Sequence, residues 1–100
     1  MSDYVTLDPQ SFTDDELLSA ARGETTYLNP QLAVTLLRAK LGPSAEQPLV
    51  ELAIDETVDQ RVRQAAVLEL AGYARARDVL TELARSPNDI VAAAAAQALR

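Results

Sequence analysis

The sequence predicts an all-α protein built from stacked antiparallel helix pairs, and three observations support this fold class. Alanine and leucine dominate a 100-residue composition with 4% aromatic residues and 3 glycines, which is typical of helices. Capping residues and glycines mark helix starts and stops at regular intervals along the chain. A segment of roughly 30 residues recurs, as it does in helical repeat proteins.

Capping signals divide the chain into helices. Thr13 and Glu16 have the spacing of a capping box, and Asn29 stands directly before Pro30 as an N-cap stands before a proline at N1. The other predicted N-caps are Ser44, either Thr57 or Asp59, and Ser86. Gly23, Gly42 and Gly72 follow apolar periodic segments, where a left-handed residue commonly ends a helix. The predicted helices span 14–22, 30–41, 45–55, 60–71, 76–85 and 88–100, after a non-helical arm over residues 1–12.

The repeat is clearest between two segments that lie 29 residues apart. Residues 62–70 align with 91–99, so that Val62 matches Val91, Ala66 matches Ala95 and Leu70 matches Leu99. Shifting back by the same distance gives a divergent first copy with leucines in place of alanines. A single helix pair cannot bury its apolar face, so the pairs should stack into one domain over residues 13–100. The three pairs lie near 13–42, 44–72 and 75–100.

The second pair carries a recognisable motif. Its residues are Asp59, Val62-Arg63, Ala65-Ala66, Leu70 and Gly72. This motif resembles the second helix of short bacterial HEAT-like repeats, which also occur in phycobilisome lyases. The resemblance implies a right-handed α-solenoid of about three antiparallel pairs with six helices, whose second helices line a concave binding face. Arg63 is expected to contact Asp59 at the turn, and Ala92 takes the place of the arginine in the last copy.

Composition excludes several kinds of chemistry. The chain has no cysteine and no histidine, so it lacks thiolate nucleophiles, disulfides and the commonest general base and metal ligand. No catalytic, cofactor-binding or metal-binding residues are predicted, and the chain is not expected to be an enzyme. A net charge of −6 disfavours nucleic acid as a partner. No membrane-spanning run or secretory signal is visible, so a cytoplasmic location is expected.

Helical geometry predicts which residues face outward. With 100° per residue counted from Val62, the opposite side of its helix carries Gln60, Gln64 and Val67. The 29-residue shift extends this stripe to the other pairs. The predicted stripe consists of Gln31, Thr35, Arg38, Gln60, Gln64, Val67, Ala93 and Ala96. Solvated residues without a binding role are the alternative for its polar members.

The last helix has unusually few polar residues for the end of a stack. Ala92, Ala93 and Ala96 lie away from the side formed by Val91 and Ala95, where a terminal repeat should be polar. This composition predicts docking of another protein or of a second copy at the C-terminal end. Helix stabilisation by alanine and a missing following repeat are the alternatives.

The predicted function is a non-catalytic protein–protein interaction module: a small scaffold, adaptor or accessory subunit that binds another protein through its concave face and apolar C-terminal end. One alternative is an inhibitor or immunity-type protein whose acidic patches would cover a basic target. Such a patch is the acidic turn formed by Glu51, Asp55, Glu56 and Asp59. A lyase-like HEAT enzyme subunit is another alternative. The apolar arm residues are expected to fold over the first pair or to dock on another chain. These residues are Tyr4, Val5, Leu7 and Phe12.

Overall fold

The computed structural model of the chain describes residues 8–100, and within this range the regular structure is helical. The α-helices are α1 (Asp14–Ala21), α2 (Pro30–Leu41), α3 (Glu46–Ile54), α4 (Gln60–Leu70), α5 (Arg77–Leu83) and α6 (Asp89–Ala98). Short 3₁₀ turns lie at η1 (Pro9–Ser11), η2 (Gly42–Ala45) and η3 (Ala74–Ala76). Each α-helix begins and ends within two residues of its predicted range.

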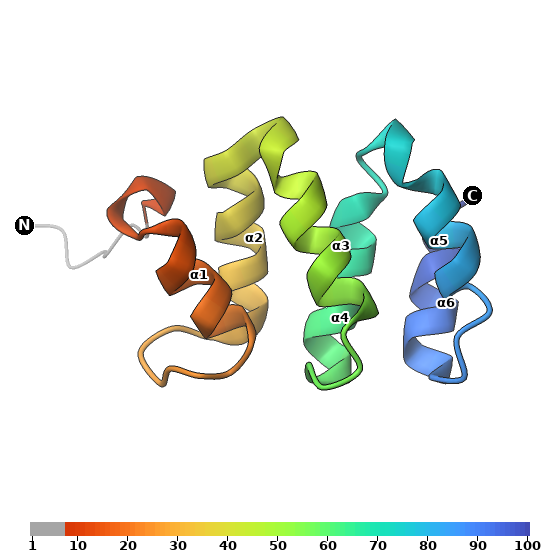
Figure 1. Cartoon of the computed structure of the whole chain (residues 1–100), viewed down its shortest axis with the longest axis horizontal. Helices are drawn as coiled ribbons and strands as arrows, with labels where there is room; N and C mark the ends of the chain where they lie inside the picture. The colour runs from red at the N-terminus through yellow and green to blue at the C-terminus, as the bar shows by residue number, and fades with distance from the viewer. Residues whose placement is uncertain (1–7) are drawn as a thin grey trace, which may run out of the picture.

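Consecutive helices pair and the pairs stack along the long axis of the molecule (Figure 1). The packing partners are α1 with α2, α3 with α4, and α5 with α6, while α4 also contacts α2 and α6. The second helices therefore form one layer with α4 at its centre. The stack measures 48 × 25 × 23 Å, so its faces are long relative to its thickness.

One continuous apolar core runs through the stack. Its largest fully buried side chains are Leu17, Val34, Leu37, Leu49, Leu52, Val67, Leu70 and Val91. Ala33, Ala53, Ala66 and Ala95 are also completely buried. Small side chains at these points let neighbouring helix backbones approach closely, while the leucines fill the space between them.

Two of the predicted helix starts are confirmed in atomic detail. Glu16 N–H donates to Thr13 Oγ1 at 3.0 Å, and Thr13 N–H donates to Glu16 Oε1 at 2.8 Å, which completes the capping box. Asn29 Oδ1 accepts from the first backbone N–H groups of α2. These contacts satisfy donors that a helix start otherwise leaves without partners.

Two other predicted caps, Ser44 and Ser86, are wrong, and one of the two alternatives for α4 is confirmed. Ser44 lies inside η2, which runs directly into α3, so the backbone rather than a side chain satisfies the start of that helix. Asp59, not Thr57, caps α4 by accepting from Arg61 N–H at 2.8 Å. Asn88 caps α6 in place of Ser86. The Ser86 hydroxyl instead accepts from the backbone N–H of Asn88, before the helix begins.

The three glycines serve two different purposes. Gly23 and Gly42 have φ values of 77° and 54°, which favour glycine as predicted. Gly72 does not have a positive φ, so the predicted left-handed cap is wrong there. A Cβ at Gly72 would lie 2.5 Å from Nη2 of Arg38, so glycine leaves room for that guanidinium.

The described part of the N-terminal arm is attached to the first helix pair. Lys40 Nζ donates to the Phe12 carbonyl at 2.6 Å and pairs with Asp14 at 2.9 Å, while the Phe12 ring packs against the core. Pro9–Ser11 form the 3₁₀ turn η1, so the prediction of a wholly non-helical arm is wrong there. The expectations for Tyr4, Val5 and Leu7 lie outside the described residues.

An ion pair links the first two helix pairs at the ends of α1 and α3. Asp55 follows α3 and accepts from the Thr57 hydroxyl at 2.6 Å, from Arg22 Nη1 at 2.7 Å and from Thr57 N–H at 2.9 Å. All three donors favour the carboxylate. The Thr57 hydroxyl is the strongest cause, and together with Arg22 it lowers the pKa of Asp55 from 3.8 to about 2.

This pKa predicts a dependence of stability on pH. Because the folded-state pKa lies below the unfolded one, the stabilisation is fully present above about pH 4 and is lost as the pH falls through about 2. Asp55→Asn should therefore melt at a lower temperature than the wild type at about pH 5, with a smaller difference at about pH 2. Thermal melts followed by circular dichroism measure this, with exposed Glu51→Gln as the control. A difference that does not change with pH would contradict the Asp55 contacts.

Candidate protein-binding face

The exposed sides of α2, α4 and α6 form one surface, because residues 29 apart occupy equivalent helical positions. We call this surface the second-helix face. Three rows of residues cross it, each with one member on each helix. The rows are Leu32, Arg61 and Ile90; Thr35, Gln64 and Ala93; and Ala39, Leu68 and Gln97. All of these side chains are exposed except Gln64, which is half-buried.

The face exposes large apolar side chains. Leu32, Leu68 and Ile90 are 36%, 40% and 37% exposed, which places one such residue on each of the three second helices. The exposed alanines Ala93 and Ala96 follow Ile90 on α6. Single exposed apolar residues are ordinary, whereas large exposed apolar patches are typical of surfaces that bind another molecule.

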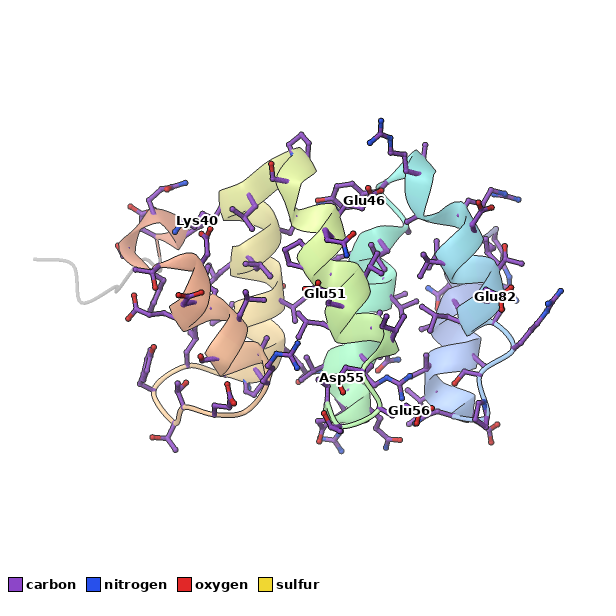
Figure 2. The ribbon with its side chains drawn as sticks, in the orientation of Figure 1. Lys40, Glu46, Glu51, Asp55, Glu56 and Glu82 are labelled. Carbon is purple, nitrogen blue, oxygen red and sulfur yellow. The ribbon has the colours of Figure 1, made fainter. Side chains whose placement is uncertain are left out.

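Charge is distributed unevenly between the two layers of the stack. Helices α1, α3 and α5 contain seven acidic residues and one arginine, whereas α2, α4 and α6 contain four basic and two acidic residues. Figure 2 shows Glu46 and Glu51 along α3, Asp55 and Glu56 at its end, and Glu82 on α5. The second helices therefore carry the smaller net charge. Within the three rows of the second-helix face, the charged residue is Arg61.

The structure places the predicted stripe residues in different environments. Gln31, Thr35, Gln60, Ala93 and Ala96 are exposed, and Gln64 and Ala92 are half-buried. Val67 is completely buried, so its prediction as an outward residue is wrong. The reason is that α4 is covered by α2 and α6 as well as by α3, which widens its buried arc to include Arg63 and Val67.

Arg38 is also engaged within the protein rather than free on the stripe. Its Nη1 donates to the Glu69 carbonyl at 3.0 Å and to Glu69 Oε2 at 2.9 Å, and its guanidinium carbon lies 4.9 Å from the centroid of the Tyr73 ring. The Tyr73 hydroxyl donates to the Gly42 carbonyl at 2.6 Å. We call these residues the Arg38 clasp. They tie the end of α2 to the end of α4.

The stripe predicted from the sequence missed the three large apolar residues. Leu32 and Ile90 are separated by twice the 29-residue repeat, so they share a helical position with Arg61. Leu68 follows Val67 and takes the outward place that Val67 was expected to fill. An apolar residue recurring at an outward position of two copies was the signal that the sequence contained.

Arg63 makes a contact that the motif did not predict. Its Nε donates to the Ala53 carbonyl in the last turn of α3 at 3.0 Å, while the carboxylate of Asp59 accepts from Arg61 N–H instead. The Arg63 side chain therefore joins α4 to α3. Arg63 N–H donates to the Asp59 carbonyl at 3.0 Å, so the expected contact at the turn forms through the backbone, while the Arg63 guanidinium reaches the end of α3 instead of the Asp59 carboxylate.

Among residues 8–100, acidic side chains do not gather in a group that could hold a metal ion. No helix in the same range is long and apolar enough to cross a membrane.

Comparison with known proteins identifies the family. The model of the HEAT repeats matches residues 15–100, and the chain belongs to the HEAT repeat family. Comparisons with curated proteins and with solved structures give no match. HEAT repeats generally mediate protein–protein interaction, and they do so through surfaces that stacked helices provide.

Proposed function

We propose that this protein is a non-catalytic interaction module, a small scaffold, adaptor or accessory subunit that binds another protein through the second-helix face. The observation that carries the proposal is the exposure of Leu32, Leu68 and Ile90 on one face. Interfaces concentrate apolar residues at their centre and polar ones at their rim. Gln31, Gln60 and Gln97 are polar residues of this kind beside the apolar ones.

The C-terminal end extends this surface. Ala93 and Ala96 are exposed and Ala92 is half-buried on α6, next to Ile90. Small side chains let a partner helix approach closely, and the area they add is apolar. The proposed occupant is another protein. In the self-associating form of the proposal, that protein is a second copy of this chain. Sedimentation velocity of the wild type distinguishes the two.

The test compares two variants that each add negative charge at an exposed apolar position. Leu68→Glu combined with Ile90→Glu alters the second-helix face, while Tyr27→Glu alters a residue in the loop between α1 and α2 that is 59% exposed. Both should fold, since exposed substitutions usually change stability by about 0.5 kcal/mol or less. The double variant should recover its native partner from lysate roughly tenfold less than wild type, because apolar centres carry most of the binding energy.

Quantitative mass spectrometry of the recovered proteins measures this effect. Circular dichroism of each variant confirms that the helices remain. A partner that the wild type, the double variant and Tyr27→Glu recover equally would place the binding site away from the second-helix face.

A second candidate function rests on the acidic first helices. Glu46, Glu51 and Glu56 lie on one side of the molecule in Figure 2, and such a surface fits an inhibitor or immunity-type protein that covers a basic target. Salt separates the two candidates, because binding by surface charges weakens steeply as ionic strength rises, whereas apolar contacts do not. The partner recovered in the experiment above can be measured at low and high salt for this purpose.

A further inference from the structure

The first-helix layer opens between the second and third pairs. In the same layer, the Arg22–Asp55 ion pair at 2.7 Å links the first pair to the second. Between α3 and α5, no ion pair forms among residues 8–100, and the two helices make no extensive contact. A pocket of about 490 Å³ lies in this gap.

The pocket has apolar walls and a charged floor. Val50 and Ile54 line it from α3, and Val79 and Leu83 line it from α5. Arg63 of α4 lines it from the layer below and is only 6% exposed. Ile54 is 53% exposed although it is a large apolar residue. This wall is therefore available to a ligand without rearrangement.

Arg63 has hydrogen-bonding capacity to spare. Its Nε donates to the Ala53 carbonyl, but no carboxylate within residues 8–100 forms an ion pair with its guanidinium. A guanidinium has five N–H donors in a planar fork that matches a carboxylate. The Nη groups of Arg63 are not among the buried atoms that lack a hydrogen-bond partner, so they reach solvent although the residue is only 6% exposed. A carboxylate ligand in the pocket can therefore accept from them.

We propose that this pocket binds the C-terminal residue of a partner protein, with an apolar side chain between α3 and α5 and its terminal carboxylate on Arg63. A chain end brings the carboxylate and the side chain on one Cα, so both fit a small pocket. An internal acidic segment would also bring flanking peptide groups. The walls are helices whose backbone groups are already paired, so those peptide groups would lose their hydrogen bonds.

The rim adds a preference for the residues that precede the chain end. Glu56 and Glu82 stand at the opening, on the turn after α3 and on α5, as Figure 2 shows. Arg85 lies at the same rim, 3.9 Å from Glu82. The two glutamates favour a basic residue shortly before the apolar end, because opposite charges at a rim direct a partner to its site.

The test uses fluorescein-labelled hexapeptides that end in a free leucine, isoleucine, valine or phenylalanine, with a lysine two residues before the end. At least one should bind saturably in fluorescence anisotropy, and its C-terminal amide should bind roughly tenfold more weakly, because the amide has no charge for Arg63. Arg63→Lys should weaken binding of the free acid roughly tenfold, since lysine lacks the planar fork. Arg61→Lys, at an exposed position of the same helix, should bind like wild type.

Ile54→Ser tests the pocket even if the Arg63→Lys variant fails to fold. Ile54 is exposed, so its substitution leaves the core intact. This variant should bind the peptide roughly fivefold more weakly, because it removes apolar wall area. The proposal does not depend on the second-helix face, and Leu68→Glu with Ile90→Glu should bind the peptide like wild type. Three results would overturn it: no binding by any of the four peptides, equal binding of acid and amide, or tighter binding of an amidated peptide with an internal aspartate.

Discussion

Ala66→Asp is expected to destabilise the protein by about 4 kcal/mol or more, which is most of the stability of a small domain. Ala66 is completely buried in α4, the helix that contacts α2, α3 and α6 at the centre of the stack. The aspartate would place a carboxylate in the apolar core, and it would add volume where the backbones lie close. Burying such a group without a partner is strongly unfavourable.

Urea unfolding followed by circular dichroism measures this loss. Ala93→Asp is the matched control, because Ala93 is an exposed alanine within α6 and its replacement should change stability by about 0.5 kcal/mol or less. If Ala66→Asp and Ala93→Asp unfold at the same urea concentration, then Ala66 does not face the core and the register of α4 is incorrect.

Arg38→Glu is expected to lower the free energy of unfolding by about 2 kcal/mol, the second largest effect. The substitution removes the hydrogen bonds to Glu69 and the cation over the Tyr73 ring, and it places two carboxylates side by side. The side chains of Arg38 and Glu69 are 38% and 29% exposed, so solvent screens part of the ion pair and the loss stays moderate.

Two further variants isolate the Arg38 clasp. Arg61→Glu makes the same charge change at an exposed position of α4, and it should leave stability nearly unaltered. Adding Glu69→Arg to Arg38→Glu reverses the pair and should recover part of the loss, which a double-mutant cycle quantifies. Equal destabilisation by Arg38→Glu and Arg61→Glu would show that net charge, and not the clasp, accounts for the effect.

The two proposed binding surfaces lie on different layers of the stack and use different chemistry. The second-helix face offers exposed apolar side chains among polar ones with little charge, and its partner should cover them as one extended contact. The pocket between α3 and α5 offers a single buried guanidinium with apolar walls, which suits one anchoring residue.

Local sequence signals were sufficient to predict the helices. Thr13, Asn29 and Asp59 cap helices because their side chains accept from the next backbone N–H groups, an interaction that depends on neighbours in sequence alone. The match between Ala66 and Ala95 also identified buried positions correctly, since both are completely buried. The repeat shows which helices are equivalent to one another. Such repeated helix pairs are the feature that defines the HEAT family.

The sequence by itself therefore determined the helices, because caps and periodicity act over one or two turns. The 29-residue repeat and its motif determined how the helices pair and which family they belong to. Only the tertiary structure decided how wide the buried side of each helix is. Val67 is buried and Leu68 is exposed because α4 lies between two neighbouring helices, and no local signal records how many neighbours a helix has. The same holds for Arg63, whose contact with Ala53 and place beneath the pocket follow from the spacing of α3 and α5.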